Sequence, residues 1–262
     1  MVIGIDMGAS AVKVCGLDGD EILFTHYENG RGGDIAALLE RLGVDPGKAG
    51  RIALTGLSAR VSGLEGRGLP LCYVSEPDAI GEGAVWLAGR DNAVVASIGT
   101  GTAFVLARAG AYTHLCGSGV GGGTLKGLAV RMIGVREMAR FDELALRGDT
   151  GAVDLLIGDF AESYGMLDPN MTASNLARLN EAATDADWAA GLTNLVLQTI
   201  GTMSLLACRS GGADCVIVTG AMAGSAPSRL NFKGFSEIYG VPYIIPPCCE
   251  CATAIGAARL AQ

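Results

Sequence analysis

The same series of expected elements occurs twice along this chain, and the repetition limits the possible folds more than any other sequence feature. In each half a short apolar run ends at a tight glycine-containing turn, and a second run, a third strand-like stretch, a helical pattern and another strand follow. These segments are 2–6, 7–10, 11–15, 21–27, 35–42 and 51–55 in the first half, and 93–98, 99–102, 103–108, 111–115, 125–135 and 215–219 in the second. The repetition predicts two α/β lobes, residues 1–90 and 91–262, with a ligand cleft between the two turns.

The remaining elements are expected from local patterns. A short strand over 71–74 leads into a helix that ends near residue 87. In the second half, helical patterns are expected at 141–147, 152–160 and 188–208, followed by a last strand at 243–245 and a last helix at 253–260.

Composition limits the partners of this chain. The net charge is −8, whereas proteins that bind nucleic acids or acidic membranes broadly present basic surfaces. No uninterrupted apolar run approaches the roughly 20 residues that span a bilayer, and the N-terminus lacks the segments of a signal peptide. Half of the eight cysteines lie within apolar runs, as buried thiols do. We therefore expect a cytoplasmic, reduced protein without nucleic-acid or membrane partners.

A glycine cluster at 117–124 runs directly into the apolar stretch 125–135. Glycine lets the backbone approach a bulky group, and the amides and partial positive charge of a helix start attract phosphate. The alternative is a flexible hairpin loop. Read with the turns at 7–10 and 99–102, the cluster predicts one side of a phosphate clamp. The pattern GxxxxGK[ST] of a Walker loop does not occur in the sequence.

Two charged residues flank the first turn. Asp6 stands at the end of the first strand, and its carboxylate is a hard oxygen ligand that suits Mg²⁺ held through water. The alternative is that Asp6 only caps the turn. Lys13 lies between two valines, so its side chain is expected to face away from the core, toward either a phosphate or the solvent.

Glu76 lies at an expected helix start. Ser75 and Asp78 have the spacing of a capping box, and Pro77 fixes the first turn of the helix. The helix dipole favours the ionised form of Glu76, and a carboxylate at the cleft suits proton acceptance from a hydroxyl during phosphoryl transfer. The alternative is a helix-start acid that has no part in chemistry.

Further candidates flank the glycine cluster and lie near the C-terminus. His114 precedes the cluster and is a candidate contact for an anionic substrate, the alternative being a strand residue without a ligand. Cys248, Cys249 and Cys251 lie close together, but they lack the spacing of common metal or cluster ligands.

In this order the motifs resemble the type II pantothenate kinases of the actin/sugar-kinase superfamily over nearly the whole chain. The matching segments are 4–13, 76–79, 99–102, 119–123, 171–175, 219–221 and 253–257. The resemblance implies a duplicated ribonuclease-H-like (actin-like ATPase) fold, with two lobes around a nucleotide cleft. It also implies a homodimer formed through the second lobe, where helix 188–208 lies, and a C-terminal helix packed on the N-terminal lobe.

The resemblance also implies an activity, namely phosphorylation of the 4′-hydroxyl of pantothenate with ATP and Mg²⁺, which opens coenzyme A biosynthesis. It assigns the catalytic base to Glu76, and the metal to Asp6. Substrate contact falls on His114. The implied nucleotide contacts are Asp6, Met7, Gly8, Ala9, Ser10, Ala11, Val12, Lys13, Thr100, Gly122, Gly123, Thr124, Leu125, Lys126, Met138 and Ala221.

Two departures from the family pattern bear on the substrate. The first turn reads Gly8-Ala9-Ser10 where the family has Gly-Gly-Thr, and His114 stands where the family has an arginine. An imidazole cannot make the bidentate contact of a guanidinium.

Three alternative functions therefore stay open. One is a kinase of another small alcohol such as an amino sugar, and another is a nucleotide-binding sensor without catalysis. The third is an ATPase like the 2-hydroxyacyl-CoA dehydratase activators, with a cluster on Cys248, Cys249 and Cys251.

Overall fold

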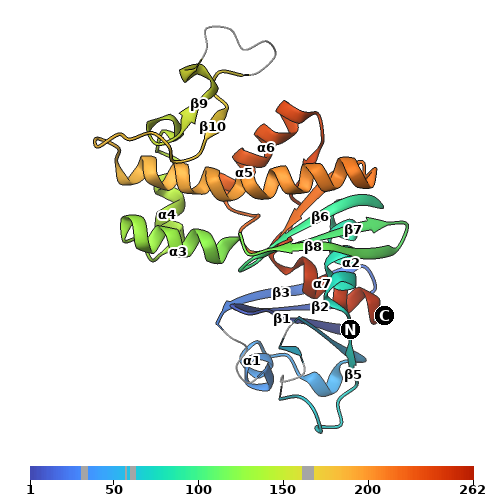
Figure 1. Ribbon diagram of the computed structural model, residues 1–262. Coiled ribbons are helices and arrows are strands. Elements are labelled where there is room, and N and C mark those ends of the chain that lie inside the picture. The colour runs from blue at the N-terminus through green and yellow to red at the C-terminus, as the bar shows by residue number, and fades with distance from the viewer. Residues whose placement is uncertain (31–34, 57, 60–62, 161–167) are drawn as a thin grey trace.

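The computed structural model describes residues 1–30, 35–56, 58–59, 63–160 and 168–262, which form two lobes (Figure 1). Each lobe is built on a five-stranded mixed sheet, and the strand orders are β3-β2-β1-β4-β5 and β12-β11-β6-β7-β8. In both sheets the first strand of the lobe is central, with the antiparallel meander on one side and two parallel strands on the other. The duplicated α/β architecture predicted from the sequence is confirmed.

The first sheet carries its antiparallel and parallel strands on opposite sides of β1. Its strands are β1 (Val2–Met7), β2 (Ala11–Asp18), β3 (Glu21–Asn29), β4 (Arg51–Thr55) and β5 (Leu71–Tyr73). Helix α1 (Ile35–Arg41) buries Leu38 and Leu39 against one face of this sheet, and the short helix η1 (Pro46–Lys48) leads into β4.

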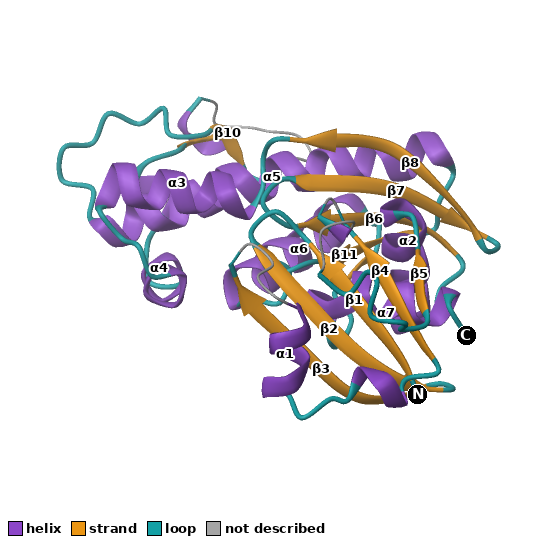
Figure 2. Ribbon diagram, turned by 90° about the horizontal axis from the view of Figure 1, so that it is seen from below, coloured by secondary structure: helices purple, strands orange, loops and turns teal. Residues whose placement is uncertain are grey.

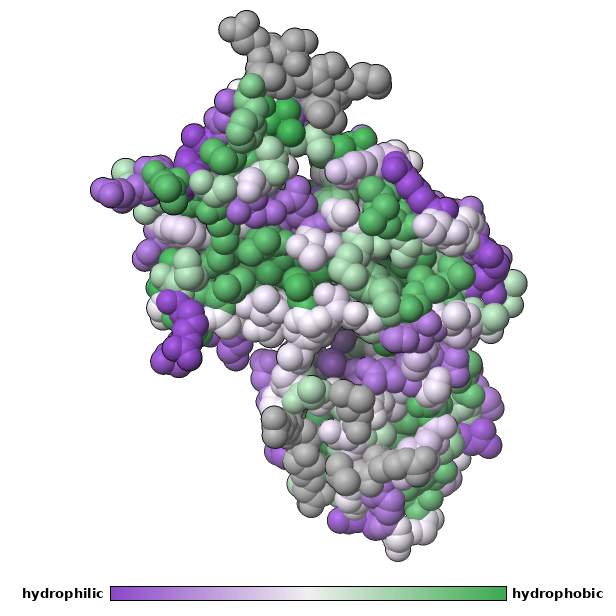
Figure 3. Space-filling model, in the orientation of Figure 1, coloured by the Kyte–Doolittle hydropathy of each residue, from purple (hydrophilic) through white to green (hydrophobic). Residues whose placement is uncertain are grey.

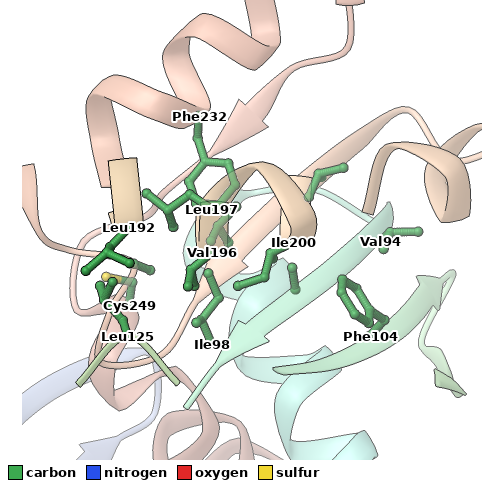
Figure 4. Packing of buried hydrophobic residues seen from close by; sticks show 14 of the residues in the cluster. Val94, Ile98, Phe104, Leu125, Leu192, Val196, Leu197, Ile200, Phe232 and Cys249 are labelled. Atoms are coloured by element: carbon green, nitrogen blue, oxygen red, sulfur yellow. The ribbon is translucent and has the colours of Figure 1, made fainter. Parts of the chain in front are cut away.

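The second sheet repeats this arrangement and supports a larger set of helices. Its strands are β6 (Asn92–Ile98), β7 (Thr102–Arg108), β8 (Ala111–Ser118), β11 (Cys215–Thr219) and β12 (Tyr243–Ile244), and its helices are α3 (Gly122–Ile133), α4 (Met138–Ala145), α5 (Asp185–Gly211) and α6 (Ala226–Tyr239). Figure 4 shows Val196 and Ile200 of α5 between Phe232 of α6 and Ile98 of the sheet. This packing makes α5 the central helix of the lobe.

Helix α5 is long and apolar enough to cross a membrane by length and composition alone. More than half of its most apolar window is buried inside the protein, as in the core helix of a globular lobe. Its ends are capped, by the Thr184 side chain at the start and by left-handed Gly212 at the end.

Two helices lie between the sheets and cross over from one lobe to the other. Helix α2 (Glu76–Ala88) follows β5 of the first lobe but packs on the second sheet, and α7 (Ala252–Leu260) follows the second sheet but packs on β1, β2 and β4 (Figure 2). They touch through glycines, because a Cβ on Gly83 would lie 1.8 Å from the Ala252 carbonyl oxygen and one on Gly256 1.9 Å from that of Ala79. The two lobes are therefore joined through a close contact of two helix backbones.

The helix expected over 152–160 is wrong. This segment contains the short helices η3 (Thr150–Ala152) and η4 (Ile157–Asp159) on either side of strand β9 (Leu155–Leu156), which pairs with β10 (Thr172–Ser174). The cause is Asp154, whose fully buried carboxylate accepts hydrogen bonds from the Thr172 hydroxyl, the Leu176 amide and the Asn194 side chain. These tertiary contacts outweigh the local helical pattern.

Two further differences from the prediction are the length of the glycine-rich loop and the presence of helix α6. The glycine-rich loop is shorter than expected, since β8 extends to Ser118 and α3 already begins at Gly122. Helix α6 was not expected, although Ser225 as N-cap, Pro227 in the first turn and Gly240 as C-cap are ordinary helix signals.

Candidate active site

The two glycine-containing turns meet across the lobes. The Ser10 hydroxyl of the first turn and the Thr100 hydroxyl of the second lie 2.8 Å apart, within hydrogen-bond distance. Within the described part of the chain, the backbone amides of Ala9, Ser10, Thr100 and Gly101 donate no hydrogen bond. Four amides and two hydroxyls thus converge at one place, a donor set that suits a phosphate chain.

The glycine-rich loop, the predicted glycine cluster at 117–124, is bonded to the second turn through the start of α3. The amides of Gly122 and Gly123, at the start of α3, donate to the carbonyl oxygens of Gly99 and Thr100 at 2.9 Å each. They are not free for a phosphate in this arrangement. A Cβ on Gly123 would lie 2.7 Å from the Thr100 side chain, so glycine is needed for α3 to hold the second turn this closely. The loop fixes the turn, and the turn presents the free donors.

Asp6 and Lys13 form a largely buried ion pair beneath the first turn. Lys13 Nζ lies 3.0 Å from Asp6 Oδ2, and their side chains are 14% and 7% exposed. Burial raises the pKa of Asp6, and the Lys13 ammonium acts in the opposite direction. A Cβ on Gly8 would lie 3.1 Å from Lys13 Nζ, so the ammonium sits against the turn. The alternative in which the Lys13 side chain points into solvent is therefore wrong, because that side chain is largely buried.

Glu76 is the first residue of α2 and is half-buried. Ser75 caps the helix, accepting from the Asp78 amide and donating to the Asp78 carboxylate at 2.6 Å. The Glu76 carboxylate makes no hydrogen bond to any described residue. Burial raises its pKa and the Asp6 charge adds to the rise, whereas Lys13 and His114 oppose it. Glu76 is thus near enough to Asp6, Lys13 and His114 for these ionisable groups to influence its pKa.

His114 lies on β8, the edge strand of the second sheet, and is exposed. The register shifts where Phe104 pairs with Cys116 and Val105 with His114, which leaves Leu115 of β8 without a partner residue and places His114 opposite Val105. Val105 faces α2 in the core, which places His114 on the side of the sheet that carries Glu76. Figure 3 shows a hollow with hydrophilic side chains between the two lobes.

Among the remaining residues implied as nucleotide contacts, Thr124 uses its hydroxyl within the glycine-rich loop, where it donates to the Gly119 carbonyl oxygen at 2.9 Å, and the others fall into three groups. Four are buried in the lobe cores and can meet a ligand only through the backbone, namely Met7, Ala11, Val12 and Leu125. Lys126 is exposed on α3, and the Ala221 turn adjoins the glycine-rich loop, because a Cβ on Gly122 would lie 3.9 Å from Met222 Cβ. Met138 begins α4 and packs on the second-lobe core, so the structure does not bring it to the two turns by any contact described above.

The cysteine cluster does not form a metal site. Among the described residues, no three His, Cys, Asp or Glu side chains are arranged to hold a metal ion. Cys249 belongs to the core of the second lobe, whereas Cys251 packs with Cys15 against the first sheet. Burial raises the pKa of Cys249 to about 11 and that of Cys251 to about 12, so both thiols stay protonated.

Sequence reasoning passed over one polar residue beside these groups. Thr55 ends β4 next to Asp6 and is 1% exposed, and its hydroxyl has no hydrogen-bond partner in the part of the chain that the structure describes. The signal was present in the sequence, since Thr55-Gly56 repeats as Thr219-Gly220 at the matching strand end of the second lobe.

Comparison with known sequences relates the chain to one family. A sequence model of the Fumble family matches residues 93–232. A type II pantothenate kinase of Oceanobacillus iheyensis is 26% identical over 245 residues, covering 90% of either chain. Another, of Staphylococcus epidermidis, is 25% identical over 231 residues, which are 84% of this chain and 85% of the relative. The resemblance inferred from the motifs is confirmed.

Comparison with solved structures finds the same fold in two components of CoA dehydratase systems. The activator of the 2-hydroxyisocaproyl-CoA dehydratase from Clostridium difficile, with bound ADPNP, matches with a TM-score of 0.70 and 17% identity, covering 99% of this chain and 93% of the other. Component A of the (R)-2-hydroxyglutaryl-CoA dehydratase from Acidaminococcus fermentans matches with a TM-score of 0.70 and 20% identity, covering 100% and 99%. These likenesses concern the fold.

Proposed function

The chain belongs to the Fumble family, and from this membership we propose that it phosphorylates pantothenate with ATP to give 4′-phosphopantothenate. The observation that carries the proposal is the position of Glu76. Its carboxylate begins α2 without a hydrogen-bond partner among the described residues, within electrostatic reach of Asp6, Lys13 and His114. A carboxylate so placed suits acceptance of a proton from an attacking hydroxyl.

The two turns are proposed to bind the triphosphate. The free amides of Ala9, Ser10, Thr100 and Gly101 provide hydrogen-bond donors without a net charge, and Lys13 lies beneath them. Such fixed donors stabilise the charge that develops on the transferred phosphoryl group. The donor set also fits Mg²⁺, because Asp6 Oδ1 is an oxygen that Lys13 leaves free; a bound Mg²⁺ would neutralise phosphate charge.

In this proposal His114 recognises the acceptor. Its imidazole is exposed on the side of β8 that carries Glu76, where it can donate a hydrogen bond to a carboxylate of the substrate. The hydroxyl to be phosphorylated would then lie against Glu76, which takes its proton as the hydroxyl oxygen bonds the γ-phosphorus of ATP and the bond from that phosphorus to the bridging oxygen breaks, releasing ADP.

The test is ADP release measured with and without pantothenate on purified protein. Glu76→Gln should keep nucleotide binding and lower turnover by roughly 10²–10⁴-fold, because the amide cannot accept the proton. Asp78→Asn is the matched control, since that carboxylate lies in the same helix turn but is engaged by Ser75. If ADP release does not respond to pantothenate, the acceptor is another alcohol. Near-normal turnover of Glu76→Gln would show that Glu76 is not the catalytic base.

We further propose that the protein is a homodimer formed through the second lobe. Apolar side chains lie exposed on its helices, among them Leu206 of α5 at 60% and Leu230 of α6 at 62%. Figure 3 shows hydrophobic surface gathered over this lobe. Light scattering should give twice the chain mass, and Leu206→Glu should give the monomer; an unchanged mass for the variant would exclude this face.

An activator-like ATPase is the second candidate, favoured by the TM-score of 0.70 to the dehydratase activators. It predicts iron in anaerobically purified protein and ATP hydrolysis without an alcohol acceptor. Iron-free, colourless protein would exclude the activator-like function.

A further inference from the structure

Two threonines occupy equivalent positions in the two lobes, and neither hydroxyl has a hydrogen-bond partner among the described residues. Thr55 ends β4 and Thr219 ends β11; both are 1% exposed, and neither Oγ1 makes a hydrogen bond within the described part of the chain. Each precedes a glycine with positive φ, +92° at Gly56 and +94° at Gly220. Because an unpaired buried hydroxyl is unfavourable, such a group points to a water or ligand that completes the site.

The surroundings of the two hydroxyls differ. Thr55 pairs in register with Asp6 of β1, whereas Thr219 pairs with Ser97 of β6. Side chains alternate along a strand, and Ala53, two residues earlier, packs with alanines of α2 and α7. Thr55 therefore faces the same side of the sheet as Ala53, the side on which the two crossing helices lie.

Thr55 also lies between the two carboxylates of the site. In the sheet order, β4 stands between β1, which carries Asp6, and β5. Beyond β5 the chain stays beside β4, as the Val74 amide donates to the Leu54 carbonyl oxygen at 2.9 Å, and it reaches Glu76 two residues later. The unpaired hydroxyl is thus flanked by Asp6 on one strand and by the segment that leads to Glu76 on the other.

The carboxylate of Asp6 presents one oxygen to each neighbouring strand. Oδ2 accepts from Lys13 of β2. Oδ1 is directed to the end of β4, because a Cβ on Gly56 would lie only 2.8 Å from it. Among the described residues no hydrogen bond reaches Oδ1, so an unpaired carboxylate oxygen and an unpaired hydroxyl lie at the same strand end.

We propose that Thr55 is a positioning residue, and that its hydroxyl and Asp6 Oδ1 together bind a water molecule of the hydrated divalent cation that accompanies the nucleotide. Oxygen ligands and retained water suit a hard cation, and Mg²⁺ gives up its water reluctantly. The water donates one hydrogen to each oxygen, which supplies the partner that both lack. The inference shares a metal–nucleotide substrate with the proposed function and is independent of which alcohol is phosphorylated.

The experiment is a titration of the full chain with Mn²⁺, followed by electron paramagnetic resonance, in the presence of a non-hydrolysable ATP analogue. Thr55→Val keeps the shape and removes the hydroxyl, and it should weaken Mn²⁺ binding about tenfold. Thr55→Ser should restore the affinity to within about twofold. Thr193→Val is the matched control, because Thr193 of α5 is also buried and unpartnered but lies in the second lobe; its affinity should not change.

The melting temperature separates this role from a purely structural one. Thr55→Val should melt at or above the wild-type temperature, because the hydroxyl makes no bond within the protein. Wild-type Mn²⁺ affinity in Thr55→Val, or in Thr55→Ala should the valine variant fail to fold, would overturn the proposal. A wild-type protein that binds Mn²⁺ and nucleotide but does not phosphorylate pantothenate would refute the proposed substrate and leave Thr55 in its role.

Discussion

Glu76 carries its charge where the surroundings disfavour it. Burial and the nearby Asp6 raise its pKa, and Lys13 and His114 offset only part of that rise. A base must be ionised to accept a proton, so kcat/KM should fall as the pH drops through a value above the ordinary glutamate range near 4.3. The measurement is a pH–rate profile, with Asp78→Asn as a control that should keep the same acid limb. An acid limb at or below pH 4 would contradict the raised pKa.

The ionised carboxylate of Glu76 should also lower the stability of the fold at pH 7. A carboxyl group with a raised pKa stabilises the fold below its unfolded pKa, and that contribution is lost as the pH rises through the folded value. Glu76→Gln cannot ionise and keeps the contribution, so it should melt above the wild type at pH 7, with the difference vanishing below about pH 4. Thermal melts at several pH values test this, and a less stable variant at pH 7 would contradict it.

At this scale the sequence predicted local interactions more reliably than contacts between distant segments. The spacing around Ser75 and Asp78 predicted the helix start at Glu76, because a cap is a local interaction. The use of the Gly122 and Gly123 amides by the second turn depends on segments that meet only in the fold, whereas Lys13 meets Asp6 across the β1–β2 hairpin. A glycine pattern announces close backbone approach but does not say to what.

The crossing of α2 and α7 is the element on which the arrangement of the lobes depends. Gly256→Ala would place a methyl group 1.9 Å from the Ala79 carbonyl oxygen, which belongs to helix backbone and cannot move aside cheaply. We expect a loss of at least about 2 kcal/mol in unfolding free energy, measured by urea denaturation.

A control for that substitution exists in the second lobe. Gly234 lies in α6 with no atom within 4 Å of an added Cβ, so Gly234→Ala should gain about 0.5–1 kcal/mol from helix propensity. If both variants lose the same stability, the close contact of α2 and α7 is not the cause.

Helices and strands could be predicted from the sequence where the interactions that form them are local. The meander over β1 to β3 and the long helix α5 were predicted, because strand alternation, turn glycines and apolar periodicity lie within each segment. The structure of the segment 152–160 was not predicted, because the hydrogen-bond donors to the Asp154 carboxylate lie 18 to 40 positions away in the chain. A buried carboxylate whose donors lie so far along the chain produces no periodic pattern in the sequence around it.

Across the whole molecule, the repetition of one unit was enough to predict two facing lobes, but not how they are fastened together. Arg259 of α7 bonds Glu82 of α2 at 2.7 Å and Asp20 of the β2–β3 turn at 2.7 Å, and its guanidinium lies 4.5 Å from the centre of the Trp86 ring. Tyr112 of β8 donates to the other oxygen of Glu82 at 2.5 Å. One side-chain network therefore joins segments that pack with both sheets.

Removing the centre of this network should weaken the whole fold. Arg259→Gln leaves Glu82, whose side chain is 18% exposed, without its cation, and we expect a loss of about 2–3 kcal/mol in urea denaturation. Asp20 is 82% exposed, so Asp20→Asn should change stability by less than about 0.5 kcal/mol. The double variant with Glu82→Gln should recover part of the loss, because no unpaired charge remains. Equal effects of the Arg259 and Asp20 substitutions would show that the ion pair between α2 and α7 does not fasten the lobes.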